Sequence, residues 1–255
     1  MKYLIFLDID GTLITHRGVA ERTRNALEEA VKAGHWIFIN TGRAKGNLPM
    51  HHLKDLPLSG IVAGLGSYIE MDDQVLYSAP LSADDIAFAM QLSKQTGIGI
   101  ILECEDRLID YRHGRPSHWP TSPYQTTDID DFLARFSDVR VSKISFIEHL
   151  PDEIEQQLRS RMYVINHPTY AEAGSIGHTK ASAMEMLQRH LEIDVSHVIA
   201  MGDSLNDVDM LRAAGIAVVM GDGHEQVKSL ADFISIDAHL GGVGQAIEEL
   251  VLKKQ

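Results

Sequence analysis

Cysteine is nearly absent from this 255-residue sequence, since Cys104 is the only one. A single cysteine excludes an internal disulfide and predicts a reducing compartment, for which we expect a cytoplasmic location. No apolar stretch approaches the ~20 residues of a membrane helix. The short apolar run at the start ends in two acids, unlike a signal peptide. We therefore expect no membrane partner.

Basic residues are also scarce: 23 Lys and Arg stand against 36 Asp and Glu, for a formal net charge of −13. A surface of this charge repels nucleic acid and anionic lipid, so we expect neither as a partner. A small anionic substrate requires a local cation to counter the overall field. The hydrophobic share of 44% is ordinary for a globular protein, and the sequence carries no sign of the oligomeric state.

Strand-like and helix-like segments alternate at both ends of the sequence, which predicts an α/β fold with a doubly wound parallel sheet. The first set of predicted elements comprises strands Tyr3–Leu7, His35–Asn40 and Gly60–Ala63, helices Glu21–Lys32 and Lys45–Leu53, and a hairpin formed by Ser67–Met71 and Gln74–Ser78. The second set comprises helices Lys180–His190 and Asp207–Ala214 and strands His197–Met201 and Ile216–Met220.

Between these sets, residues 82–173 predict a compact α+β unit inserted into the outer fold. Its predicted helices are Ser82–Thr96, Ile129–Phe136 and Pro151–Arg161, and its predicted strands are Ile98–Cys104, Arg107–Arg112, Lys143–Glu148 and Met162–Asn166. A loop rich in Pro, Ser and aromatic residues covers 113–128. We therefore expect a core formed by residues 1–81 and 174–255, with 82–173 as a cap.

Polar clusters follow several of the predicted strands. Asp8 and Asp10 end the first strand, although buried carboxylates are costly unless something positive pairs with them. The other clusters are Thr41-Gly42-Arg43, Gly202-Asp203-Ser204-Leu205-Asn206-Asp207 and the helix-opening Lys180. Each alone is common in turns and helix caps. Because the carboxyl ends of parallel strands share one edge, however, we expect all of them to converge there.

Clustered carboxylates without a paired base repel one another, so a divalent cation is their natural partner. Oxygen ligands in a small cluster favour Mg²⁺, which binds one or two protein carboxylates together with substrate phosphate. Lys180 then supplies a second positive charge, and Thr41 and Gly42 complete a cradle for the phosphoryl group. One carboxylate can attack phosphorus, and a second can protonate the leaving oxygen and later activate water. The pattern predicts a small phosphorylated substrate.

The segment Asp8-Ile9-Asp10-Gly11-Thr12-Leu13 resembles the first motif of the haloacid dehalogenase-like superfamily. The Thr41 cluster, Lys180 and the Asp203 cluster resemble its second, third and fourth motifs. The insertion point resembles that of the Cof-type hydrolases. This resemblance implies a Rossmann-like core and a Mg²⁺-dependent phosphatase that forms an aspartyl phosphate. A phosphomutase of the same superfamily and a phosphoacceptor signalling domain are the alternatives.

The resemblance also implies a role for each residue. Asp8 is the nucleophile and Asp10 the acid/base. Magnesium is held by the Asp8 side chain, the Asp10 carbonyl, Asp203 and Asp207, the last directly or through water. The phosphoryl oxygens are bound by Thr41, Gly42, Lys180 and Asn206.

The sequence departs from the family pattern in two places. Leu65-Gly66-Ser67 replaces the usual Asn-Gly-Ala, and Gly221-Asp222-Gly223 replaces the usual Gly-Asn-Ala, which adds an acid near the rim of the site. The cationic and aromatic residues of the inserted loop suit a phosphorylated substrate, with a merely solvated loop as the alternative. The candidates for substrate specificity there are Arg112, His113, Arg115 and Trp119.

Overall fold

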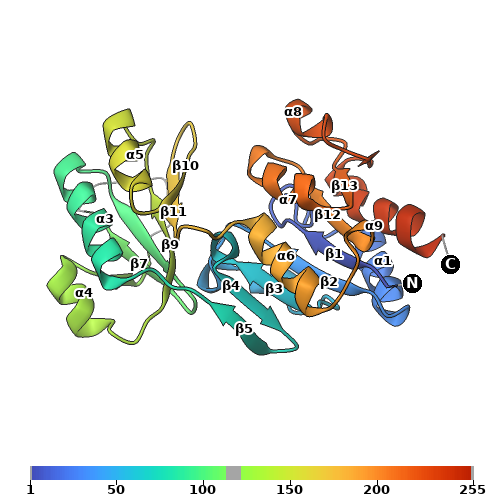
Figure 1. Cartoon of the computed structure of the whole chain (residues 1–255), viewed down its shortest axis with the longest axis horizontal. Helices are drawn as coiled ribbons and strands as arrows, with labels where there is room; N and C mark the ends of the chain where they lie inside the picture. The colour runs from blue at the N-terminus through green and yellow to red at the C-terminus, as the bar shows by residue number, and fades with distance from the viewer. Residues whose placement is uncertain (1, 113–121, 254–255) are drawn as a thin grey trace. The chain divides into compact units, whose positions relative to one another are not determined.

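A computed structural model of the chain describes residues 2–112 and 122–253. It divides into two compact units, drawn in Figure 1. The first, here called the larger unit, comprises Met1–Gly42, Pro49–Leu76 and Thr179–Gln255. The second, the inserted unit, comprises Arg43–Leu48 and Tyr77–His178. In the described ranges, no helix has the length and apolarity to cross a membrane.

The larger unit is built on an eight-stranded sheet of order β14-β13-β12-β1-β2-β3-β4-β5. These strands are β1 (Leu4–Leu7), β2 (Trp36–Asn40), β3 (Gly60–Ala63), β4 (Tyr68–Met71), β5 (Gln74–Ser78), β12 (Val198–Gly202), β13 (Ile216–Val219) and β14 (Phe233–Ile234). The central strand β1 pairs in parallel with β12 on one side and β2 on the other. Strand β4 runs antiparallel to β3. The strand order confirms the predicted doubly wound α/β fold.

The helices of the larger unit follow its strands along the chain. They are α1 (Glu21–Lys32), α2 (Met50–Leu53), α6 (Lys180–His190), α7 (Val208–Ala213), α8 (Glu225–Lys228) and α9 (Gly242–Ile247), the last continued by a π-helical segment at Glu248–Leu252. Helix α1 packs against α9, and α6 packs against α7. In α1 the spacing of the buried Ala26, Leu27 and Ala30 explains which face is covered.

The prediction of one helix over Lys45–Leu53 is wrong. A 3-10 turn at Lys45–Asn47 is followed by α2, which begins only at Met50. Pro49 separates them because it lacks an N–H group and disfavours helical dihedrals at the residue before it. The break also separates the two units, since Arg43–Leu48 groups with the inserted unit and Pro49 with the larger one.

The inserted unit contains a six-stranded sheet of order β10-β11-β9-β6-β7-β8. The strands are β6 (Ile100–Cys104), β7 (Leu108–Tyr111), β8 (Tyr124–Gln125), β9 (Val141–Phe146), β10 (Tyr163–Asn166) and β11 (Ala171–Gly174), and the helices are α3 (Ala83–Thr96), α4 (Ile129–Arg135) and α5 (Asp152–Arg159). Strand β11 was not predicted, since Ala-Glu-Ala-Gly has low strand propensity. It lies between β9 and β10 and is antiparallel to both.

The segment Arg43–Leu48 is bound closely within the inserted unit. The Ala44 N–H and the Asn47 side-chain amide donate to Glu103 Oε2 at 3.3 and 3.2 Å. At Gly46 a Cβ atom would lie 2.4 Å from the backbone nitrogen of Arg107, so only glycine permits this approach. The compact unit therefore contains residues on both sides of the stretch 82–173 that the sequence indicated.

Candidate active site

Asp8 and Asp203, two of the acids predicted from the sequence, lie where β1 and β12 end. Asp8 directly follows β1, and Asp203 directly follows β12, its parallel neighbour. Between them the chain turns at Gly11, whose φ is +85°. A Cβ atom at Gly11 would lie 2.5 Å from Asp203 Oδ2. Glycine is therefore required here both for the positive φ and for the close approach of the turn to the carboxylate.

Lys180 lies between two of the acids. It is the first residue of α6, a helix capped by Thr179, whose side chain accepts a hydrogen bond from the Ser182 N–H. Its Nζ lies 2.5 Å from Asp8 Oδ1 and 2.7 Å from Asp207 Oδ1. All three side chains are buried. Two acids together raise the pKa of Lys180 above its usual value, although burial alone would lower it.

Asp207 uses both of its carboxylate oxygens within the protein. Oδ1 accepts from Lys180, and Oδ2 accepts from the backbone N–H groups of Asp203 and Ser204, each at 3.1 Å. Gly202 leaves room for this arrangement, because a Cβ atom there would lie 2.6 Å from the Asp207 carboxyl carbon. Asp207 thus anchors both Lys180 and the loop that presents Asp203.

The negative charge of these carboxyl groups is only partly neutralised by their surroundings. Asp8, Asp203 and Asp207 each place one oxygen within 4.8 Å of the others, and Lys180 is the cation bonded to this group. Burial, assisted by repulsion from Asp207, raises the pKa of Asp8 to about 7 despite the attraction of Lys180. Burial likewise raises the pKa of Asp203 to about 6, although the Thr12 hydroxyl donates to its Oδ1 at 2.9 Å.

The arrangement fits a divalent cation. Three carboxylates against one ammonium group leave two negative charges in a small buried volume, and the ligand atoms on offer are all oxygens. This donor set matches the preference of Mg²⁺. Asp8 Oδ2 and Asp203 Oδ2 accept no hydrogen bond among those recorded for the described residues, whereas both Asp207 oxygens do.

The remaining predicted residues of the larger unit lie on neighbouring loops. Asp10 is exposed and sits on the turn that begins at Asp8. Thr41 is buried directly after β2, where its N–H donates to the Val62 carbonyl at 3.0 Å, and Gly42 follows it. Asn206 accepts the Ser204 hydroxyl hydrogen bond through Oδ1 at 2.8 Å.

The predicted specificity residues belong to the inserted unit. Arg112 was expected to contribute to substrate specificity; its side chain is buried, and its Nη2 lies 3.1 Å from Asp110 Oδ1. This ion pair lies in the interior of the unit, and a role for Arg112 in substrate specificity stays a prediction. His113, Arg115 and Trp119 lie outside the described residues.

Two residues at the site had no role assigned from the sequence. Thr12 orients Asp203 through the hydrogen bond given above. Asn40, fully buried at the end of β2, donates its side-chain amide to the Lys180 carbonyl at 3.0 Å and so holds the start of α6. A signal for Asn40 was present, because an amide that ends an apolar strand requires a hydrogen-bond partner.

Comparison with known proteins identifies the family to which this chain belongs. The sequence profile of the haloacid dehalogenase-like hydrolase family matches residues 5–247. The chain belongs to this family and is therefore an enzyme of the hydrolase class, as the motifs predicted.

Similar proteins match over nearly the full chain. A putative phosphatase, YkrA from Bacillus subtilis, is 26% identical, with 98% of each chain covered. The 5-amino-6-(5-phospho-D-ribitylamino)uracil phosphatase YcsE of the same organism is 27% identical, covering 98% of this chain and 96% of the relative. A solved phosphatase of the haloalkanoate enzyme superfamily from Bacteroides thetaiotaomicron is 27% identical, with a TM-score of 0.83, and covers 97% of this chain and 94% of that one.

Proposed function

We propose that this hydrolase is a Mg²⁺-dependent phosphatase that cleaves a small phosphorylated metabolite through an aspartyl phosphate on Asp8. The observation that carries the proposal is the buried contact of Lys180 with Asp8 and Asp207, 2.5 and 2.7 Å away, beside Asp203. Neutralising and positioning charge supplies most of the catalysis in phosphoryl transfer. A cluster of acids around one lysine is suited to that task.

In the first step, Asp8 attacks phosphorus. Lys180 binds Oδ1, which orients the carboxylate so that Oδ2 forms the new bond to phosphorus while the bond to the leaving oxygen breaks. Asp10, exposed on the adjoining turn, donates a proton to the leaving oxygen. The product is a neutral alcohol together with phosphate bound covalently to Asp8.

In the second step, the aspartyl phosphate is hydrolysed. Asp10, now ionised, removes a proton from water, and the water oxygen attacks phosphorus as the bond to Asp8 breaks. Inorganic phosphate leaves and the Asp8 carboxylate is regenerated. We propose that Thr41, Gly42, Lys180 and Asn206 hold the phosphoryl oxygens during both steps.

Magnesium would be held by the side chains of Asp8 and Asp203 and by the Asp10 carbonyl. When bound, it supplies positive charge that keeps Asp8 ionised at neutral pH and neutralises the phosphoryl oxygens. In this arrangement Asp207 acts indirectly, because both of its oxygens already hold Lys180 and the loop of Asp203.

Relatives support a small phosphorylated substrate. Their names include a phosphatase acting on a phosphoribitylamino-uracil, a phosphoglycolate phosphatase and an HMP-PP phosphatase. At 25–28% identity they differ among themselves in substrate, so we propose only the shared reaction, which is release of phosphate from a small molecule.

The test is phosphate release from a panel of phosphorylated metabolites with Mg²⁺ and with EDTA. Asp8→Asn keeps the size of the side chain but removes the nucleophile, and we expect turnover to fall by at least about 10³-fold without loss of fold. Asp209→Asn, an exposed acid on α7, serves as the control. Near-normal turnover by Asp8→Asn, or equal turnover in EDTA, would refute the mechanism. An isomerised sugar phosphate in place of free phosphate would identify a mutase.

A further inference from the structure

A cavity of about 390 Å³ adjoins the turn that carries Asp10. It lies wholly within the larger unit. Its lining consists of Asp10, Gly11, Ile14, Thr15, His16, Asp222 and His239. The volume lies in the range of small-molecule sites. Gly11 lines this cavity, and a Cβ atom on it would lie 2.5 Å from Asp203 Oδ2, so the cavity adjoins the proposed reaction centre.

The lining is rich in acceptors of hydrogen bonds and holds no permanent cation. Asp10 and Asp222 contribute carboxylates, Thr15 a hydroxyl, and His16 and His239 imidazoles whose ring centroids are 6.1 Å apart. Neither Lys nor Arg occurs among the described residues that line it. Since Asp10 carries a proton when it acts as the acid, an anionic leaving group in this space would meet the negative charge of Asp222, with neither Lys nor Arg in the described lining to offset it.

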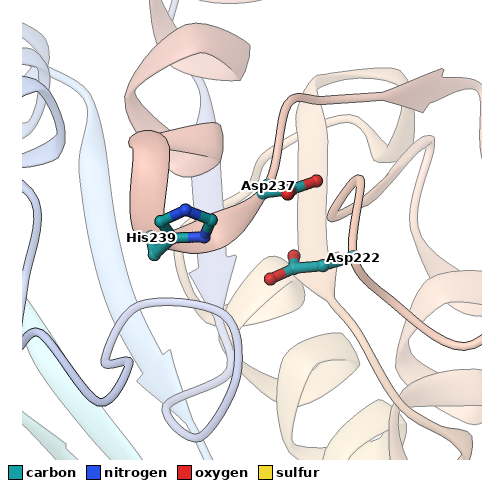
Figure 2. A group of neighbouring side chains, drawn as sticks. All are labelled: Asp222, Asp237 and His239. Carbon is teal, nitrogen blue, oxygen red and sulfur yellow. The ribbon is translucent and has the colours of Figure 1, made fainter.

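A third acid strengthens the negative character at one end. Figure 2 shows Asp222, Asp237 and His239 grouped where the loop after β13 meets the turn at Ala238–Leu240. One ligand atom from each lies within 4.8 Å of the others. Asp222 Oδ1 also accepts the Ala238 N–H at 2.9 Å, which fixes the direction of its carboxylate.

We infer that this cavity is the subsite for the leaving group, and that it selects leaving groups bearing hydroxyl or amino groups over those bearing a carboxylate or a second phosphate. The inference rests on the proposed function, which places the leaving oxygen beside Asp10. Hydroxyl and amino groups donate to the carboxylates and imidazoles of the lining, whereas an added anion is repelled by Asp222 and Asp237.

Asp222 is the acid of the described lining that takes no part in the proposed reaction. A neutral amide at this position would leave the cavity open to anionic leaving groups. The acid converts the same space into one that discriminates by charge. The effect of one charge at a partly exposed site of this kind is of the order of a five- to tenfold change in relative rate.

Glycerol 3-phosphate and 3-phosphoglycerate provide a matched pair of probes, because they differ in a CH₂OH group against a carboxylate. With Mg²⁺ present, we expect kcat/KM for glycerol phosphate to exceed that for phosphoglycerate by about tenfold or more. Asp222→Asn retains the oxygen that accepts the Ala238 N–H, and we expect it to reduce this ratio about five- to tenfold by improving the phosphoglycerate reaction. Asp209→Asn removes the same charge outside the cavity and should leave the ratio unchanged.

The outcomes separate this inference from the function on which it rests. If no metabolite in the panel releases phosphate, the proposed function fails and the inference fails with it. If phosphate is released but the two probes react equally, or Asp222→Asn leaves their ratio unchanged, the inference alone is refuted. It is also refuted if Mn²⁺ raises the Tm of the wild type but not of Asp237→Asn, because the cluster would then be a metal site.

Discussion

Each unit of this protein contains one lysine buried between two carboxylates. Lys180 contacts Asp8 and Asp207 in the larger unit, and Lys143 contacts Glu103 and Glu172 in the inserted unit. In both cases burial lowers the pKa of the lysine, and the two acids raise it by more. By composition the two clusters are nearly the same.

The two clusters differ in the hydrogen bonds that their acids accept from groups other than the lysine. In the inserted unit, the Ser145 hydroxyl donates to Glu103 Oε1 at 2.5 Å, and His167 Nε2 lies 3.1 Å from Glu172 Oε2. Although burial opposes it, the attraction of Lys143 lowers the pKa of Glu172 to about 2. In the larger unit the pKa of Asp8 is instead raised to about 7. The hydrogen bonds of the Lys143 cluster suit a structural role, whereas the raised pKa of Asp8 suits the cation site proposed above.

The largest expected effect is a difference in kcat between variants that lack one or the other of the two lysines. Lys180→Met removes the cation that orients Asp8, and we expect kcat to fall by about 10²–10³-fold, as for loss of one preorganised donor. Lys143→Met should leave the kcat of the folded protein within about twofold, since it contacts no proposed catalytic group. Steady-state phosphate release, corrected for folded fraction by circular dichroism, measures both. Equal losses in the two variants would contradict the comparison.

The next effect is on stability. Lys143→Met leaves Glu103 and Glu172 buried without their cation, and we expect the free energy of unfolding to fall by about 3–5 kcal/mol. Urea denaturation measures this change, with the exposed Lys94→Met on α3 as the matched control. A loss no greater than that of the control would show that the neutral donors alone satisfy the two glutamates.

A smaller effect is the opposite response of the two clusters to pH in metal-free protein. Asp8 and Asp203 have folded pKa values of about 7 and 6, above the ordinary 3.8. The folded state therefore binds their protons more tightly, and stability should rise as pH falls from about 7 toward 4. The pKa of Glu172 is lowered from 4.5 to about 2, so its carboxylate contributes stability that is lost as pH falls from about 4.5 to about 2.

Thermal unfolding in EDTA across pH 2–8 measures both responses. Asp203→Asn should flatten the curve above about pH 4, and Glu172→Gln should flatten it below that value. Mg²⁺ should raise the Tm most at neutral pH, where it no longer competes with protons. A Tm that declines steadily from pH 7 to 4 in the metal-free wild type would contradict the assignment of the raised pKa values.

The smallest effect concerns Cys104. Burial, followed by repulsion from Asp106, raises the pKa of its thiol to about 12, so the reactive thiolate is scarce at neutral pH. We expect no alkylation of the native protein by iodoacetamide at pH 7 and complete alkylation after unfolding, as measured by mass spectrometry. Rapid labelling of the native protein would show that the strand carrying Cys104 opens readily.

Local signals in the sequence predicted much of the fold. Helices Glu21–Lys32 and Lys180–His190 were predicted with the bounds observed, because periodicity and end signals lie within the segments themselves. Strand β11 was missed because its pairing, rather than its own residues, makes it a strand. The cluster around Lys143 could not be predicted for the same reason, since Glu172 lies on that strand.

The acids of the candidate site could be grouped from the sequence because parallel strands end at one edge of a sheet. What could not be predicted is which oxygen each donor takes. The use of both Asp207 oxygens depends on the loop of Asp203, and the bond from Asn40 to Lys180 depends on the orientation of α6. These contacts join residues far apart in the chain, and only the packed structure specifies them.

The short segment Arg43–Leu48 has a practical consequence for building chimaeras. It immediately follows Thr41-Gly42 in the chain, yet its donors occupy Glu103 Oε2 in the inserted unit. If only Tyr77–His178 were moved into another protein, Glu103 would move without its two donors. Ala44 and Asn47 would stay behind without their acceptor. A transplant of the inserted unit must therefore carry these six residues with it.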